Sequence, residues 1–126
     1  MKQIISTPNA PQAVGPYSQA NVASGRAIYV AGQVSLDPVS GKPVQGDIED
    51  QTTRVFENIA AILQASGASF KHVVKVNVYL SDFANFTKMN EVYRRYFVSD
   101  YPARTTIQAV LPPGFLLEAD AVAYIE

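Results

Sequence analysis

The chain has 126 residues, and only 17% of them are charged, below the roughly 25% of a typical soluble domain. With 10 Lys and Arg against 11 Asp and Glu, the net charge of −1 leaves no basic surplus for a nucleic-acid backbone. The chain has no cysteine and one histidine, His72, which excludes disulfides, Cys-ligated or His-rich metal sites and a thiol nucleophile. Any catalysis must therefore use carboxylates, Arg or Lys, Tyr, hydroxyls or backbone groups.

The length predicts a single domain over residues 1–126. Residues 1–17 resemble neither a signal peptide nor a transit helix, and no run approaches the roughly 18 apolar residues of a membrane span. We therefore expect a cytoplasmic protein. Its low charge fraction indicates a surface partly buried against other subunits, or one rich in Ser, Thr, Gln and Asn.

Three strands are predicted first, over residues 2–5, 17–23 and 27–34. Prolines make residues 6–16 an ordered loop, and Ser24-Gly25-Arg26 turns the chain between the second and third strands. Turn residues then build a loop over 37–43.

The first helix is predicted from apolar residues at helical spacing, with Asp47 as its N-cap and Gly67 beyond its end. Residues 73–80 alternate as a strand. A second helix follows, capped by Ser81 or Asp82, and its apolar stripe consists of Phe86, Met89, Asn90, Tyr93 and Phe97.

Two last strands, over 104–111 and 115–125, flank the turn Pro112-Pro113-Gly114. The helix–strand–helix–strand segment implies a parallel crossover, and we expect antiparallel hairpins at both ends of the chain. The predicted fold class is α+β, a two-layer sandwich of one mixed sheet with both helices on one face. If the last two strands pair, Arg104 and Glu118 lie roughly 13 Å apart along the hairpin.

The faces of two strands can be predicted from alternation. In the last strand, one face carries Leu117, Ala119, Ala121, Ala123 and Ile125, whose small side chains suit closely packed helices. In the 73–80 strand, one face carries Val74, Val76, Val78 and Leu80, and the other carries Val73, Lys75, Asn77 and Tyr79. The second face is mixed, which favours contact with another subunit, although a solvent-exposed face fits as well.

Two charged residues are candidates for chemistry. Arg104, at the start of a strand, can bind a carboxylate through two hydrogen bonds, or it can be a solvated surface residue. Glu118 shares a strand face with Asp120, and burial would make one of the two a proton carrier, whereas exposure would leave both as ordinary surface acids.

Neutral residues add weaker signals. Tyr17 follows the rigid Gly15-Pro16 turn and either contacts a ligand or packs against the protein. Gly32 lies inside a strand, which indicates a bulge or a close approach of the backbone to a ligand. Asn90 lies on an apolar helix stripe and needs a hydrogen-bond partner if it is buried. His72 has no spaced partner and is predicted to be structural or surface-exposed. Thr106, like Ser18 and Ser35, has no evident base.

Together these segments resemble the RidA/YjgF family of enamine/imine deaminases. The likeness runs in order along essentially the whole chain, through Asn9-Ala10-Pro11, Gly15-Pro16-Tyr17-Ser18-Gln19-Ala20, Ala31-Gly32-Gln33-Val34, Val74-Lys75-Val76-Asn77-Val78-Tyr79-Leu80, Asn90-Glu91-Val92-Tyr93, Pro102-Ala103-Arg104-Thr105-Thr106 and Leu117-Glu118-Ala119-Asp120-Ala121. One departure is Thr105-Thr106, where many members have Ser-Cys after the Arg.

The resemblance implies a chorismate-mutase-like fold and a homotrimer with a site in each cleft between subunits. It also implies hydrolysis of 2-aminoacrylate-type enamine or imine acids to 2-keto acids and ammonia without a cofactor. By position, Arg104 would clamp the substrate carboxylate, Glu118 would assist water, and Tyr17 would contact the ligand. The backbone near Gly32 and Thr106 would supply hydrogen bonds, with Asn90 as support.

Two other functions stay open. A non-catalytic protein that binds small acids, or a partner of a metabolic enzyme, would use the same Arg104 without turnover. A ribonuclease or translation inhibitor is also attached to the family by name, but the net charge of −1 disfavours strong RNA binding.

Overall fold

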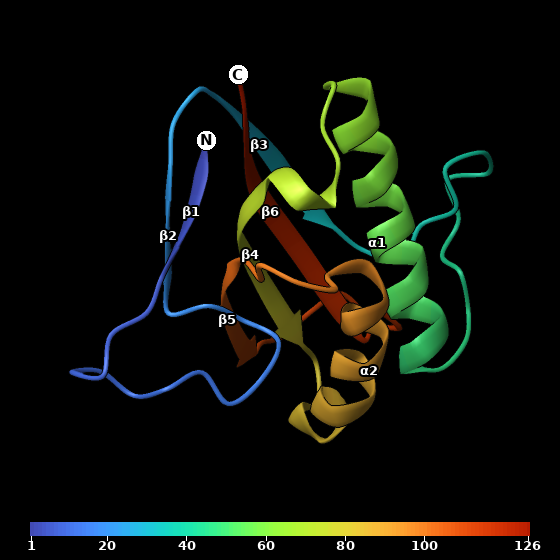
Figure 1. Ribbon diagram of the computed structural model, residues 1–126. Helices are drawn as coiled ribbons and strands as arrows, with labels where there is room; N and C mark the ends of the chain where they lie inside the picture. The colour runs from blue at the N-terminus through green and yellow to red at the C-terminus, as the bar shows by residue number, and fades with distance from the viewer.

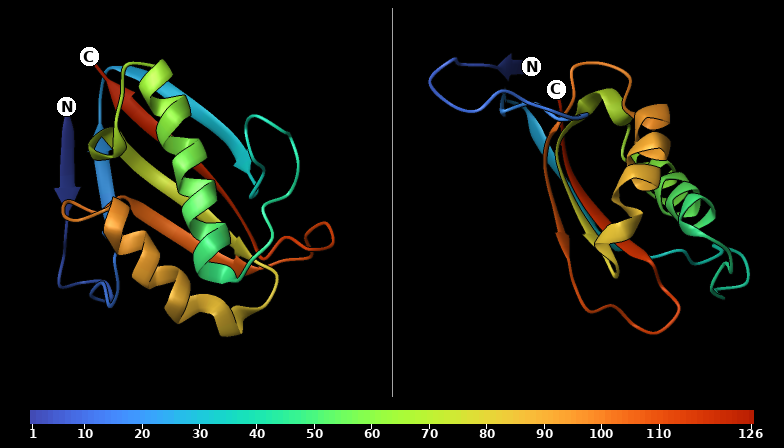
Figure 2. Two further views of the ribbon diagram at one scale, coloured as in Figure 1. Left: turned by 90° about the vertical axis from the view of Figure 1, so that its right-hand side faces the viewer. Right: turned by 90° about the horizontal axis from the view of Figure 1, so that it is seen from below.

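The computed structural model describes residues 1–126 as two helices packed on one face of a four-stranded sheet, with a separate hairpin near the N-terminus (Figure 1). The elements are β1 (Lys2–Ile5), β2 (Ala20–Ala23), β3 (Arg26–Gln33), α1 (Ile48–Ala65), β4 (Val73–Leu80), α2 (Phe86–Tyr96), β5 (Ala103–Gln108) and β6 (Leu117–Ile125). Short 3-10 turns over Phe70–His72 and Phe83–Asn85 precede β4 and α2. Figure 2 shows both helices covering the same side of the sheet, which confirms the predicted α+β two-layer architecture.

The sheet order is β3-β6-β4-β5, with β5 parallel to β4 and β6 antiparallel to β3 and β4. The expected hairpin between the last two strands is therefore wrong. Arg104 pairs instead with Val76, because the α2 crossover places β5 beside β4. The connection over 109–116 then carries the chain past β4, and β6 lies between β3 and β4.

The hairpin expected between β2 and β3 is also wrong, because β2 pairs with β1 only, with Ile4 opposite Asn21. The β1–β2 hairpin stands apart from the four-stranded sheet (Figure 2, right). Gly25, with a φ of 115°, turns the chain so that Arg26 begins β3 beside Ile125 at the end of β6.

The predicted capping chemistry is confirmed at α1, whereas α2 begins after Asn85 without a side-chain cap, because Asp82 caps the 3-10 turn that precedes this helix. The Asp47 carboxylate accepts the Asp50 N–H at 2.9 Å, and the Asp50 carboxylate accepts the Asp47 N–H in return at 3.3 Å. Gly67, with a φ of 80°, follows the end of α1. Asp82, one of the two predicted caps, accepts the Ala84 N–H at 2.9 Å at the 3-10 turn before α2.

The core lies between the helices and the sheet, and the predicted alternation of β6 is confirmed from Leu117 to Ala123. The predicted face of β4 is wrong at its start, where Val73 is buried and Val74 is only half-buried. A bulge causes the exchange, because the register with β6 shifts between Val73 and Lys75.

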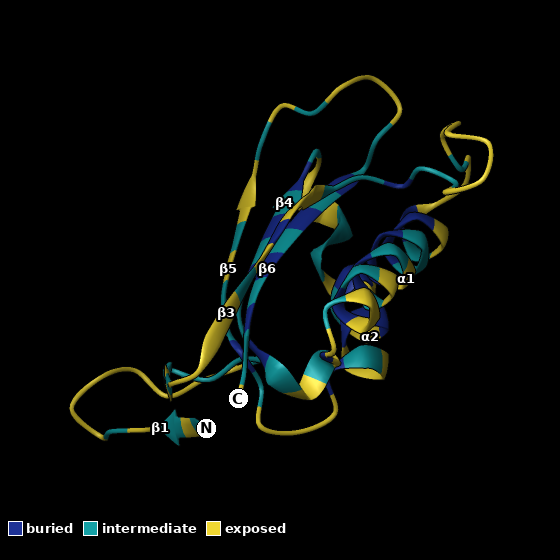
Figure 3. Ribbon diagram, turned by 90° about the horizontal axis from the view of Figure 1, so that it is seen from above, coloured by how far each residue is buried: buried dark blue, intermediate teal, exposed yellow.

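The sheet face opposite the helices is open (Figure 3). It includes large apolar side chains that are far from buried, with Tyr29 76% and Ile107 46% exposed. Neither helix is long and apolar enough to cross a membrane.

Candidate functional site

Arg104 lies on the edge strand β5, with its side chain on the face that α2 covers. Its Nη1 donates a hydrogen bond to Asn90 Oδ1 at 2.7 Å. Its Cζ lies 4.7 Å from the centre of the Tyr93 ring and 5.7 Å from that of Phe86. The guanidinium is therefore held by one hydrogen bond and two cation–π contacts.

The sequence pattern of α2 explains these contacts with Arg104. Phe86, Asn90 and Tyr93 are spaced four and three residues apart, so they share one face of the helix. Asn90 was predicted to need a partner, and Arg104 is that partner. The roles of Tyr93 and Phe86 beneath the cation were missed, because an aromatic stripe at helical spacing is also what a core helix requires.

The guanidinium is charged and has free donors. Burial lowers the pKa of Arg104, and the nearby Tyr93 and Tyr17 oppose that effect, but an Arg side chain stays protonated in proteins. Burial also raises the pKa of Tyr93 well above its usual range, so this ring is neutral. The one ion pair in the structure joins the Met1 ammonium to Glu126, so Arg104 has no carboxylate partner. It can therefore bind an incoming carboxylate through two donors.

A cavity of about 350 Å³ opens beside Arg104 at the start of β5. Tyr17 reaches it from the segment before β2, and its hydroxyl accepts the Val14 N–H at 3.3 Å. Lys75 of β4 also lines the cavity, with its Nζ donating to Thr105 Oγ1 at 3.0 Å. The remaining lining residues are Ala10, Pro11, Ser18, Gln19 and Ala103. Tyr17 and Arg104, which the resemblance assigns separately to the site, thus line the same cavity within one chain.

Glu118 and Gly32 form a second group, on the open face of the sheet. The register between β3 and β6 shifts between Val30 and Gln33, which confirms the bulge predicted at Gly32. The Glu118 carboxylate occupies the space that a Cβ at position 32 would need. Glu118 accepts no hydrogen bond within the chain, whereas the neighbouring Asp120 accepts from Asn77 at 2.8 Å and from Tyr79 at 3.4 Å.

The two groups are separate within one chain. Arg104 is level with Val76 of β4 and Glu118 is level with Tyr79, while β4 itself lies between β5 and β6. At the usual rise and strand spacing, the two Cα atoms are about 14 Å apart. The side chains also point to opposite faces of the sheet, so a single small molecule cannot contact both in one chain.

The hydroxyl candidates have no base, as expected. Thr106 lies two residues beyond Arg104 on the same face of β5, and its hydroxyl is buried without a hydrogen-bond partner. The Ser35 hydroxyl is likewise buried and unpartnered. No three His, Cys, Asp or Glu side chains gather in a way that could hold a metal ion.

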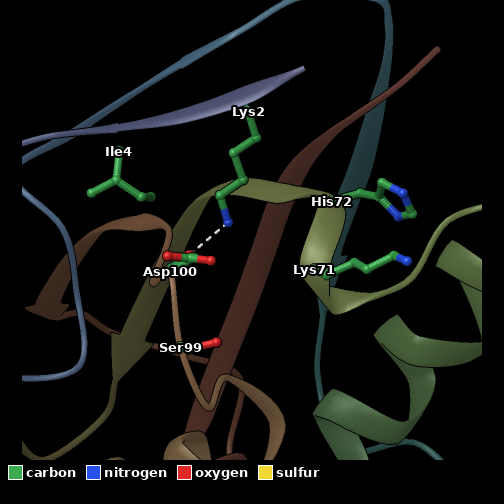
Figure 4. Close-up of a pocket in the computed structure, with 6 residues that line it drawn as sticks. All are labelled: Lys2, Ile4, Lys71, His72, Ser99 and Asp100. Atoms are coloured by element: carbon green, nitrogen blue, oxygen red, sulfur yellow. Dashed lines mark hydrogen bonds between the residues drawn. The ribbon is translucent and has the colours of Figure 1, made fainter.

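His72 lies at a different cavity, of about 470 Å³, beneath the β1–β2 hairpin (Figure 4). The ring nitrogen Nδ1 of His72 accepts the Ser69 N–H at 3.0 Å, which agrees with the prediction of a structural or surface-exposed histidine. Lys2 enters this cavity from β1, and its ammonium group donates to the backbone rather than facing a free volume.

The fold and the Arg104 cavity define a small α+β protein with a pocket at the edge of its sheet that is lined by a guanidinium without an ion-pair partner. The chain belongs to the RidA/YjgF family, since the family model described as Endoribonuclease L-PSP matches residues 7–125. It is 50% identical over 127 residues to a RutC family protein of Pyrococcus horikoshii, covering 100% of both chains. It is 44% identical over 124 residues to the 2-iminobutanoate/2-iminopropanoate deaminase of Homo sapiens, covering 98% of this chain and 90% of that protein. The crystal structure of RidA from an Antarctic Psychrobacter species matches with a TM-score of 0.76 at 43% identity, over 98% of this chain and 99% of that one.

Proposed function

We propose that this protein hydrolyses 2-imino and 2-enamino acids to 2-keto acids and ammonia. The observation that carries the proposal is Arg104, a half-buried guanidinium with free donors and no internal counter-ion beside a cavity of about 350 Å³. Such a group selects a small carboxylic acid. The name of the human relative, at 44% identity, supports an imine as the reacting group.

Hydrolysis of an imine requires few catalytic groups. The enamine form first tautomerises to the imine, whose C2 is already electrophilic. The oxygen of a water bonds to C2, the C2–N bond breaks, the nitrogen leaves as ammonia, and the remaining C2–O unit becomes the keto group. In the proposal, Glu118 accepts a proton from this water as a general base and passes it to the nitrogen, and the proton of the resulting C2 hydroxyl goes to the departing nitrogen as the C2–N bond breaks. Arg104 and Tyr17 hold the acid in place, and backbone groups near Gly32 and Thr106 supply further hydrogen bonds.

The separation of Arg104 from Glu118 makes a second copy part of the proposal. We propose a homotrimer in which the open face of one chain brings Glu118 and Gly32 to the Arg104 cavity of its neighbour. The exposed Tyr29 and Ile107 on the open face and the charge fraction of 17% favour such a contact. This assembly would supply both halves of the site without a change in the fold of either chain.

The test adds the protein to a serine or threonine dehydratase reaction and follows formation of the keto acid. The protein should accelerate this step, and Arg104→Ala should abolish the acceleration. Arg95→Ala, which removes an exposed Arg from the end of α2, is the matched control and should behave as wild type. Absence of acceleration, or full acceleration by Arg104→Ala, would refute the proposal.

Calorimetry with 2-oxobutanoate distinguishes the deaminase from a non-catalytic protein that binds small acids. Both functions require binding that depends on Arg104, but only the deaminase also accelerates the coupled reaction. Binding without turnover would therefore favour a sensor or a partner of a metabolic enzyme.

A further inference from the structure

The N-terminal arm, residues 1–23, is attached to the rest of the chain by single hydrogen bonds and the Met1–Glu126 ion pair rather than by strand pairing. Its β1–β2 hairpin pairs with no strand of the four-stranded sheet. Lys2 Nζ instead donates to the Val73 carbonyl at 2.9 Å and to the Asp100 carbonyl at 2.7 Å, and Figure 4 draws the second of these bonds. Asn21 Nδ2 donates to the Val74 carbonyl at 3.0 Å.

The carbonyls of Val73 and Val74 lie where the sheet leaves its backbone unpaired, whereas that of Asp100 lies in the loop before β5. β5 begins at Ala103 opposite Lys75, so the first two residues of β4 extend beyond it. The bulge between Val73 and Lys75 disturbs the register with β6 at the same place. Half-buried carbonyls need donors, and the arm supplies them through Lys2 and Asn21.

Lys2 makes two of these three side-chain hydrogen bonds. Burial lowers its pKa, and the nearby Asp100 carboxylate partly opposes that effect. Its ammonium group has three N–H donors, and two of them are used on these backbone carbonyls. Figure 4 shows that Lys71 and His72 of the same cavity project away from Lys2, so neither substitutes for it.

The arm also carries part of the Arg104 cavity. Tyr17, Ser18 and Gln19 line that cavity, and the Ser18 N–H donates to the Pro102 carbonyl at 3.2 Å. Lys2 is level with Ala23 of β2 in the hairpin, so an anchor on β1 also holds the strand that follows Tyr17. The segment that carries Tyr17 is thus joined to the rest of the chain at two places, through Ser18 near the cavity and through Lys2 at the far end of the arm.

We propose that Lys2 is a positioning residue: by fixing the arm to β4 and to Asp100, it seats Tyr17 in the Arg104 cavity. The inference rests on the proposed function, in which Tyr17 contacts the substrate. Lys2 itself touches neither the substrate nor Arg104. Its removal should therefore weaken binding of the acid and leave the chemical step unchanged.

The test compares Lys2→Met, Lys2→Arg and Lys71→Met. Loss of two charged hydrogen bonds in Lys2→Met should raise the KM for the imine, and the Kd for 2-oxobutanoate, about tenfold with kcat unchanged. Lys2→Arg should restore affinity, because its guanidinium can reach the same carbonyls. Lys71→Met, from the same cavity but without a hydrogen bond to the arm, should match wild type. A circular dichroism melt checks that each variant is folded.

A double-mutant cycle with Tyr17→Ala shows whether Lys2 acts through Tyr17. If it does, Lys2→Met causes no further loss of affinity in the Tyr17→Ala background. Additive losses would overturn the proposal, and so would an unchanged Kd in folded Lys2→Met. A different result, full activity of Arg104→Ala, would refute the proposed function. The Kd values still decide the role of Lys2 in that case, because calorimetry needs no turnover.

Discussion

The separation of Arg104 from Glu118 leads to a test in which two inactive variants restore each other. Arg104→Ala removes the carboxylate clamp, and Glu118→Ala removes the group proposed to assist water. In one chain these residues are about 14 Å apart at standard strand spacing and point to opposite faces of the sheet. An active site that uses both must take Arg104 from one copy and Glu118 from the next.

The expected recovery of activity follows from the fraction of sites that are intact in a mixed assembly. In an equal mixture of the two variants, a site is intact only when its Arg104 comes from the Glu118→Ala chain and its Glu118 comes from the Arg104→Ala chain. Random assembly meets both conditions at about a quarter of the interfaces, so the mixture should show about a quarter of wild-type activity. This fraction is the same for any closed ring, and light scattering measures the number of copies separately.

The assay refolds the two variants together from denaturant and follows keto-acid formation in the dehydratase reaction. Arg104→Ala mixed with Asn90→Leu is the matched control, because Asn90 contacts Arg104 within the same chain at 2.7 Å and no mixture can reunite them. Its activity should stay at the mean of the two parents. If mass spectrometry finds mixed assemblies of the first pair but their activity does not rise, the shared site is refuted.

Four single substitutions test the parts of the site and the core. Asn90→Leu removes the acceptor that orients Arg104, and loss of a charged hydrogen bond should raise the KM about tenfold in steady-state kinetics. Gly32→Ala places a Cβ where the Glu118 carboxylate lies, so kcat should fall while the melting temperature changes little. Tyr93→Phe keeps the ring under Arg104 and removes a buried hydroxyl without a partner, so the free energy of unfolding in urea should rise by about 1 kcal/mol. Leu63→Ala opens a cavity at a fully buried position and should lower that free energy by about 2–5 kcal/mol.

The elements could be predicted where local chemistry determines them. Asp47 and Gly67 bound the first helix, and the run from Val73 to Leu80 is the observed β4. Strand neighbours could not be predicted, because alternation specifies which face a residue is on and carries no information about the adjacent strand. The bulge at Val74 was equally hidden, because a one-residue shift between two adjacent valines leaves the apolar pattern unchanged.

The residues of the candidate site could be predicted from the sequence, but their contacts with one another could not. Arg104 and Asn90 were both candidates, but nothing in the sequence indicates that one is the hydrogen-bond partner of the other. Tyr93 was assigned to packing, and it does pack, while its ring also faces the guanidinium. The distance between Arg104 and Glu118 was expected to be large, but for the wrong reason, since the separating element is β4 and not the length of a hairpin.

The same geometry constrains how copies of the chain can assemble. Glu118 is presented by the open face of the sheet, whereas Arg104 is reached from the β5 edge on the helix side. A contact that joins them therefore brings two different surfaces together, which is a head-to-tail interface. Head-to-tail contacts either continue into a filament or close into a ring, and closure gives every chain one Arg104 partner and one Glu118 partner. The proposed trimer is a small ring of this kind, and it predicts as many sites as chains, so titration with 2-oxobutanoate should saturate at one ligand per chain. A stoichiometry of one ligand per assembly would instead place the binding site on the symmetry axis and contradict a cleft between neighbours.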